Sequence, residues 1–139
     1  MQSSPTKAPA RIKIQTPGAH HVTLRVSDYE RAKNFYIDTL GFDVVMEAPN
    51  LFIFFAGQTA IAIRGPEHET SQHGNFNPFR VGLDHLAFAC EREEELERVA
   101  DGLDAAGVEN TGVKVDETLG KKYVAFKDPD RIALEFYMM

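Results

Sequence analysis

Residues 82–91, GLDHLAFACE, restate a pattern that the chain has already used at residues 18–27, GAHHVTLRVS. In both stretches a glycine stands three positions before a histidine, and alternating apolar residues follow that histidine. Such alternation is typical of a strand that buries one face. His21 and His85 therefore hold the same place in two copies of one unit.

The elements that follow each histidine come in the same order in both copies. After a strand at 20–26, Ser27 and Glu30 have the form of a capping box, which predicts a helix from there to about Leu40. Strands are predicted next at 42–47, 51–56 and 59–63. The second copy predicts a strand at 83–90, a helix at 92–106 and strands at 108–115, 122–127 and 132–137. Each unit thus reads strand, helix, strand, strand, strand.

The two units divide the chain into four parts. Residues 1–17 are rich in Ser, Pro, Thr and Ala and predict a mobile tail. Residues 18–138 form one predicted domain, with module one at 18–64, a polar linker at 65–81 and module two at 82–138. We therefore expect an α+β protein built from two tandem modules.

Composition and charge exclude several classes of partner. The chain has 139 residues, of which 43% are apolar and 26% charged, as in an ordinary globular domain. Its net charge of -6 argues against a surface for nucleic acid or anionic membranes, so we expect a small-molecule partner. A single cysteine, Cys90, cannot form an internal disulfide. Without an apolar run of membrane-spanning length or a signal peptide, the sequence predicts a cytoplasmic protein.

Strand alternation groups the polar residues that could form a site. In the first strand, His21 shares a face with Thr23 and Arg25. In the last strand, Glu135 lies opposite to the apolar face formed by Ile132, Leu134 and Phe136. A carboxylate in so apolar a strand is costly to bury unless a positive group meets it.

These features together resemble the vicinal oxygen chelate superfamily. The resemblance is carried by the two tandem units, a His at the head of each first strand, the Asp128-Pro129-Asp130 turn and a Glu in the final strand, and it covers roughly residues 18–138. That superfamily includes glyoxalase I, extradiol ring-cleaving dioxygenases, fosfomycin resistance proteins and bleomycin-binding proteins. The resemblance implies two modules combined into an eight-stranded cup around one divalent metal, and a homodimer.

The resemblance also implies the ligands, which are His21, His85 and Glu135. Two neutral imidazoles and one carboxylate on one face of an ion form the facial triad typical of Fe(II), with positions left open for substrate or oxygen. Manganese, nickel or zinc could also be held, since affinity alone does not choose among them. A lone strand histidine is more often a hydrogen-bonded structural residue, so the prediction depends on all three side chains converging.

The sequence departs from the family pattern at one position that bears on chemistry. Overlaying the closing strands of the two modules sets Ala62 against Glu135. Glyoxalase I and related epimerases resemble this fold but have an acidic ligand and base there. Alanine can neither bind metal nor move a proton, so glyoxalase I chemistry requires another base.

Two relatives that use the His-His-Glu set suggest catalytic and substrate-binding candidates. Extradiol dioxygenases carry a further His between the modules, for which His73 or His68 could stand in. They also carry a Tyr in the penultimate strand, where Ala125 stands here, and Tyr123 could substitute for it. Thr23 resembles a substrate-contacting threonine of the fosfomycin enzymes, although only Lys121 and Lys122 approach their anion loop.

The predicted substrate pocket adds residues on the same faces. Thr23 and Arg25 are predicted to bind substrate because they share a strand face with His21. Phe52 and Phe54 share one face of their strand and could form an apolar wall, with plain core packing as the alternative. His20 is predicted to lie on the face opposite His21 and to be structural.

The sequence therefore predicts a divalent-metal-dependent enzyme for a small oxygen-chelating substrate. A dioxygenase-like oxidoreductase is the first hypothesis. A thiol transferase or lyase of the fosfomycin-resistance type is the second hypothesis. A metal-free drug-binding protein of the bleomycin-resistance type is the third, and it would not need three ligand-type residues at equivalent positions.

Overall fold

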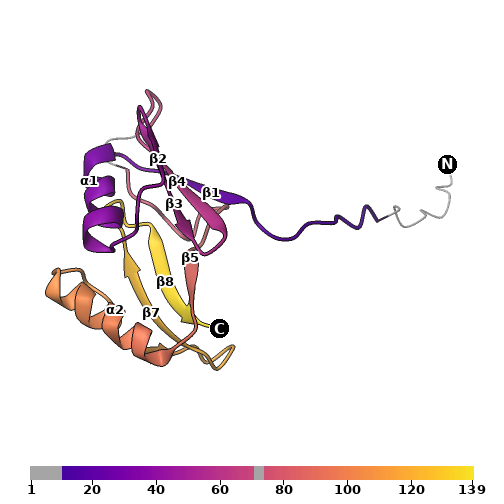
Figure 1. Cartoon of the computed structure of the whole chain (residues 1–139), viewed down its shortest axis with the longest axis vertical. Coiled ribbons are helices and arrows are strands. Elements are labelled where there is room, and N and C mark those ends of the chain that lie inside the picture. Colours follow the sequence, from indigo (N-terminus) through magenta and orange to yellow (C-terminus); the bar gives the residue numbers. More distant parts are fainter. Residues whose placement is uncertain (1–10, 71–73) are drawn as a thin grey trace, which may run out of the picture.

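Two four-stranded sheets, each with its own helix, form the protein (Figure 1). The computed structural model describes residues 11–70 and 74–139. In the first module β1 (His21–Arg25) is followed by α1 (Tyr29–Lys33) and η1 (Asn34–Thr39), and then by β2 (Met46–Ala48), β3 (Leu51–Ala56) and β4 (Thr59–Arg64). The second module contains β5 (Leu86–Cys90), α2 (Glu93–Ala105), β6 (Lys114–Val115), β7 (Lys122–Lys127) and β8 (Ala133–Met138). The predicted α+β fold of tandem modules is confirmed.

The two sheets repeat one topology. Their strand orders are β1-β4-β3-β2 and β5-β8-β7-β6. In each, the first strand lies parallel to the closing strand, while the last three strands form an antiparallel meander. The closing strand of each module thus returns to lie beside the first strand, which stands at the edge of its sheet. The residues at the head of the first strand are therefore next to the closing strand.

The register shows which positions of the modules are equivalent. Thr23, two residues after His21, pairs with Ala62 on β4. Ala87, two residues after His85, pairs with Glu135 on β8. Ala62 therefore occupies in the first sheet the position that Glu135 occupies in the second, as the sequence overlay predicted.

One apolar core joins the modules behind the sheets. The largest fully buried side chains are Tyr36, Phe52, Phe54, Ile61, Ile63, Leu96, Leu134, Val26 and Val124. Phe42 of the first module contacts Phe88 of the second, with ring centroids 5.4 Å apart, and Phe35 and Phe126 lie 6.2 Å apart. Burial of apolar surface is the main favourable contribution to folding, and these contacts bury side chains of both modules together. The two sheets therefore share one core.

A buried polar contact also connects the modules, through the Asp128-Pro129-Asp130 turn. The Tyr36 hydroxyl donates to Asp128 Oδ2 at 2.8 Å, and the Ser27 amide donates to Asp130 Oδ2 at 2.9 Å. The Ser27 hydroxyl donates to the other oxygen of Asp130. Both carboxylates are buried, so these hydrogen bonds offset the cost of removing them from water.

Several predicted element bounds differ from the structure. Asp28, not Ser27, caps the first helix, accepting a 3.0 Å hydrogen bond from the Arg31 amide, because the Ser27 side chain is bound to Asp130. The strand predicted at 42–47 is only β2, and that predicted at 108–115 is only β6 with an isolated bridge between Asn110 and Phe126. Phe42 explains the first difference, since it stacks on Phe54 in the core instead of joining the sheet.

The remaining bounds agree more closely. The predicted strands at 51–56 and 122–127 are β3 and β7, and the helix at 92–106 is α2 with one residue fewer at each end. Within residues 11–70 and 74–139, no helix is long and apolar enough to cross a membrane.

Candidate metal centre

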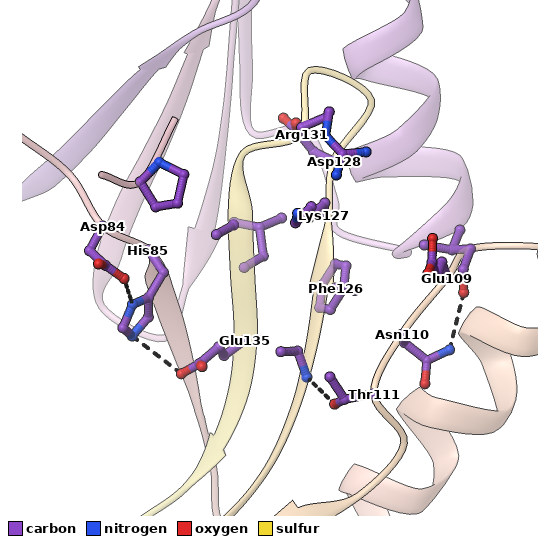
Figure 2. A pocket seen from close by; sticks show the side chains of 15 residues that line it. Asp84, His85, Glu109, Asn110, Thr111, Phe126, Lys127, Asp128, Arg131 and Glu135 are labelled. Carbon is purple, nitrogen blue, oxygen red and sulfur yellow. Dashed lines mark hydrogen bonds and ion pairs between the residues drawn. The ribbon is translucent and has the colours of Figure 1, made fainter. Parts of the chain in front are cut away.

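A cavity of about 470 Å³ lies over the second sheet (Figure 2). Its floor includes Ala125 on β7 and Glu135 on β8, which pair directly across the two strands. Strand alternation turns these two residues away from the core face, where Val124, Phe126 and Leu134 pack with α2 residue Leu96. One face of the sheet therefore builds the core, which leaves the other for a site.

His85 and Glu135 meet in this cavity. His85 Nε2 lies 3.3 Å from Glu135 Oε1, and the side chains are 42% and 19% exposed. Figure 2 shows both side chains pointing toward each other, one from the start of β5 and one from β8. An imidazole nitrogen and a carboxylate oxygen are thus side by side and accessible, which is what two ligands of one divalent ion require.

Asp84 positions the His85 ring from behind. Its Oδ1 lies 2.6 Å from His85 Nδ1. A carboxylate at Nδ1 holds the ring in one orientation, and with the proton on Nδ1 the Nε2 lone pair would be free to bind a metal ion beside Glu135. Metal-binding histidines have this arrangement in many proteins, so the contact fits a ligand better than a purely structural histidine.

The sequence reasoning missed Asp84 because neighbouring strand residues point to opposite faces. In the structure β5 begins only at Leu86, so residues 84 and 85 precede the strand and are not bound by its alternation of faces. Their side chains can therefore contact each other. One feature of the sequence could have indicated this contact. Asp84 is an acidic residue directly before a candidate histidine, at the end of an irregular segment.

His21 lies in the first module, outside this cavity. It is exposed at the start of β1, and its Nδ1 is 2.9 Å from Nδ1 of His20. Two ring nitrogens at that distance share one proton, so one ring donates and the other accepts. The expectation that His20 would lie on the opposite strand face was wrong, because β1 begins at His21 and the His20 ring is free to turn toward it.

The structure therefore brings together two of the three predicted ligands. Among the residues that the structure describes, no group of three His, Cys, Asp or Glu side chains is placed to hold a metal ion. Module two contributes an imidazole and a carboxylate, whereas module one contributes an imidazole with Ala62 beside its strand.

Thr23 and Arg25 line a second cavity, of about 480 Å³. This cavity lies between β1 and the turn of the second module, and its other residues include Ser27, Arg80 and Asp130. The Arg25 guanidinium donates to the Gly65 carbonyl oxygen at 2.7 Å. The two residues predicted to bind substrate therefore remain next to His21 in the chain but do not face the His85 and Glu135 pair.

The remaining predicted residues lie in three different surroundings. Phe52 and Phe54 have no exposed surface and belong to the core, so they line neither cavity and the packing alternative holds for them. Tyr123 stacks on Tyr137, with ring centroids 6.1 Å apart, on the sheet face that carries Glu135. His68 is exposed beside Glu69, and His73 lies outside the described residues.

Hydrogen bonds and burial shift the pKa of groups around the second sheet. Burial, the Asp116 hydrogen bond and nearby negative charge raise the pKa of Tyr137 to about 12. Its hydroxyl donates to Asp116 Oδ2 at 2.7 Å, and this bond lowers the pKa of that carboxyl. Tyr137 thus remains a neutral hydrogen-bond donor at physiological pH and is not a general base.

Comparison with known proteins finds the same fold and similar sequences. The family model described as Glyoxalase/Bleomycin resistance protein/Dioxygenase superfamily matches residues 18–136. The solved structure of a glyoxalase family protein from Enterococcus faecalis is 31% identical, with a TM-score of 0.68 over 87% of this chain and 97% of that one.

Curated proteins with similar sequences include the following three. An uncharacterised protein of Bacillus subtilis, YwkD, is 32% identical over 85% of this chain and 94% of its own. The metallothiol transferase FosB of Staphylococcus saprophyticus is 29% identical over 85% of this chain and 74% of its own. The catechol-2,3-dioxygenase of Bacillus subtilis is 31% identical over 76% of this chain but only 39% of its own length.

Proposed function

Because the chain belongs to the glyoxalase, bleomycin resistance protein and dioxygenase superfamily, we propose that it is a divalent-metal-dependent enzyme for small substrates that chelate through two adjacent oxygen atoms. The observation that carries the proposal is the His85 and Glu135 pair, with Nε2 and Oε1 3.3 Å apart and Asp84 behind the ring. Fe(II) is the favoured ion for a set of two histidines and one carboxylate.

The third ligand is proposed to be His21 of a second copy. One chain offers two ligands in module two and one in module one, so two chains related by a two-fold axis would complete two identical sites. Each site would then take His85 and Glu135 from one copy and His21 from the other. This arrangement uses the exposed position of His21 and accounts for the absence of a three-ligand group among residues 11–70 and 74–139 of one chain.

The residues of the chain would orient and bind the substrate. Bound metal would supply the Lewis acid that holds and polarises the two substrate oxygens. Ala125 stands opposite Glu135 and leaves open space beside it, whereas Asp84 would hold the His85 ring in one tautomer and orientation. The resulting cavity of about 470 Å³ is large enough for a substituted aromatic ring.

The best-supported reaction is oxidative cleavage of a catechol. A single carboxylate among the ligands leaves the ion with net positive charge, which suits a chelating dianion and O2. The similarity to catechol-2,3-dioxygenase supports the same class, although this chain spans 39% of that protein. The reaction would consume one O2 per catechol, with the ring bond broken and both oxygen atoms retained in the acyclic product.

Oxygen uptake and metal content test this proposal together. Protein purified anaerobically and loaded with Fe(II) should contain about one metal per chain and consume O2 with a panel of catechols. His85→Ala and Glu135→Ala should each lose the metal, while Glu109→Ala, elsewhere in the cavity, should retain it. Stoichiometric metal in Glu135→Ala would refute the site.

Mixing variants tests the shared site. His21→Ala and Glu135→Ala are each expected to bind little metal alone. When the two are unfolded together and refolded, random pairing should make half of the dimers mixed, each with one intact site, so metal should recover to about one quarter of the wild-type level. No recovery would mean that the three ligands act within one chain or not at all.

A metallothiol transferase is the second candidate. Its support is the similarity to FosB and the position of Thr23 and Arg25, which line a cavity beside the strand of His21. In that case the Mn-loaded protein would consume a small thiol together with an epoxide such as fosfomycin, while catechols would give no oxygen uptake. Protein that binds a drug tightly with no metal requirement would instead support the metal-free binding protein.

A further inference from the structure

Two basic side chains line the cavity of His85 and Glu135 at its other end. Lys127 is the last residue of β7, and Arg131 lies in the turn between β7 and β8. Figure 2 shows both near this turn, with Asp84 to one side of them and Glu109 to the other. Neither residue was predicted from the sequence to have a role, and neither is a proposed metal ligand.

Lys127 shares a sheet face with Glu135. It pairs with Ala133, and Ala125 pairs with Glu135, so residues 125, 127, 133 and 135 all lie on this face. Lys127 and Glu135 are then diagonal neighbours, which in an antiparallel pair lie about 7–8 Å apart. Because alanine fills the other two positions, no bulky side chain of the sheet separates the lysine from the proposed ligand.

Arg131 has a backbone conformation that is unusual for arginine. Its φ is +66°, in the left-handed region where glycine is favoured, and its amide donates to the Asp128 carbonyl oxygen at 2.8 Å. Glycine would adopt the same backbone conformation in this turn without steric strain. Strained residues of this kind cluster at functional sites, so a role for the guanidinium accounts for an arginine where the turn alone favours glycine.

The acidic residues of the cavity leave these cations available. Asp84 is bound to His85, and Asp128 accepts hydrogen bonds from the Tyr36 hydroxyl and from the amides of residues 130 and 132. Glu109 lies on the side of Lys127 and Arg131 away from Asp84 (Figure 2). Within the described part of the chain, neither Lys127 nor Arg131 has an ion-pair partner.

We propose that Lys127 and Arg131 form an anion subsite that binds a carboxylate or phosphate group of the substrate. This subsite would hold one end of the substrate, while the two vicinal oxygens at the other end would be chelated by the metal beside Glu135. The second half of this picture rests on the proposed function. The substrate class is thus a vicinal dioxygen compound with a separate acidic group, for example a carboxylated catechol. A guanidinium and an ammonium are the side chains that bind such groups most strongly.

Inorganic phosphate tests the subsite without any metal. Metal-free protein should bind phosphate in a calorimetric titration, and the double variant Lys127→Gln with Arg131→Gly should weaken binding about tenfold or more, since a hydrogen bond between charged groups accounts for at least that factor. Arg131→Gly suits its backbone conformation, so folding is preserved. The control Lys122→Gln removes one positive charge from the same strand on its other face, where Lys122 pairs with Glu93. Absent phosphate binding, or equal binding by the double variant, overturns the subsite.

A pair of catechols tests the substrate class and separates a carboxylate from a phosphate. Under anaerobic conditions, the Fe(II)-loaded protein should bind 3,4-dihydroxybenzoate about tenfold more tightly than catechol. The double variant should lose this preference and bind catechol as before, while Lys122→Gln should keep it. If the wild type binds the two catechols equally but binds phosphate in the titration, the subsite is assigned to phosphate esters. If the chain takes up no metal, the proposed function fails, whereas the phosphate titration still decides the subsite.

Discussion

The stability of the protein between pH 4 and pH 7 should depend on Asp128. This carboxyl is 4% exposed, and burial raises its pKa from its ordinary 3.8 to about 6, even though Tyr36 and two backbone amides donate hydrogen bonds to it. The neighbouring charge of Asp130 acts in the same direction as burial. Each pKa unit corresponds to about 1.4 kcal/mol, so the shift amounts to about 3 kcal/mol.

The sign follows from the protons bound in each state. Between about pH 4 and pH 6 the folded state keeps a proton on Asp128 that the unfolded state releases. The free energy of unfolding therefore falls as the pH rises through this window and levels off above it. Glu47, Glu95 and Asp116 have lowered pKa values and act in the opposite sense, because their contribution is lost as the pH falls. The difference in the free energy of unfolding between a variant and the wild type at each pH cancels the contributions of these other groups.

Asp128→Asn isolates the effect, since asparagine keeps the shape of the protonated carboxyl and cannot ionise. Urea unfolding followed by far-ultraviolet circular dichroism, at one protein concentration, gives the free energy of unfolding at each pH. Relative to the wild type, the variant should gain up to about 3 kcal/mol between pH 4 and pH 7. Asp43→Asn, at an exposed position, should show no such trend. A difference that stays flat, or a variant that loses stability as the pH rises, would mean that the three donors outweigh burial.

Three further substitutions separate stability from binding. Arg131→Gly should raise the free energy of unfolding by about 0.5–1 kcal/mol, because relief of the left-handed strain exceeds the extra chain entropy of glycine; a loss of stability in urea would contradict this. Phe54→Ala should lower the free energy of unfolding by about 3–5 kcal/mol, because it leaves a cavity in the core, while the metal content per folded chain stays unchanged. Loss of metal from the folded fraction would instead place Phe54 at the site. Asp84→Asn should weaken metal binding about tenfold or more without loss of stability, as measured by competition with a chelator; unchanged affinity would show that Asp84 does not orient His85.

The sequence alone determined the repeated architecture and the equivalence of its positions. Alternation after His21 and His85 defined two strands, and the spacing to the closing strands set Ala62 against Glu135, as the register confirms. The alternation is a local feature, because the side-chain period of a strand depends on residues close together in the chain. The bounds of β2 and β6 were less accessible, since core packing of Phe42 decided where the sheet begins.

Only the tertiary structure decided which of these residues meet. It paired His85 with Glu135, added Asp84 behind the ring, left His21 in the other module, and put Lys127 and Arg131 into the same cavity. Strand faces are known from sequence, but the placement of one module against the other depends on contacts such as those of Tyr36 with Asp128, which join residues far apart in the chain. The residue types of the proposed ligands were therefore readable in the sequence, whereas the placement of His21 apart from His85 and Glu135 was a consequence of how the modules pack.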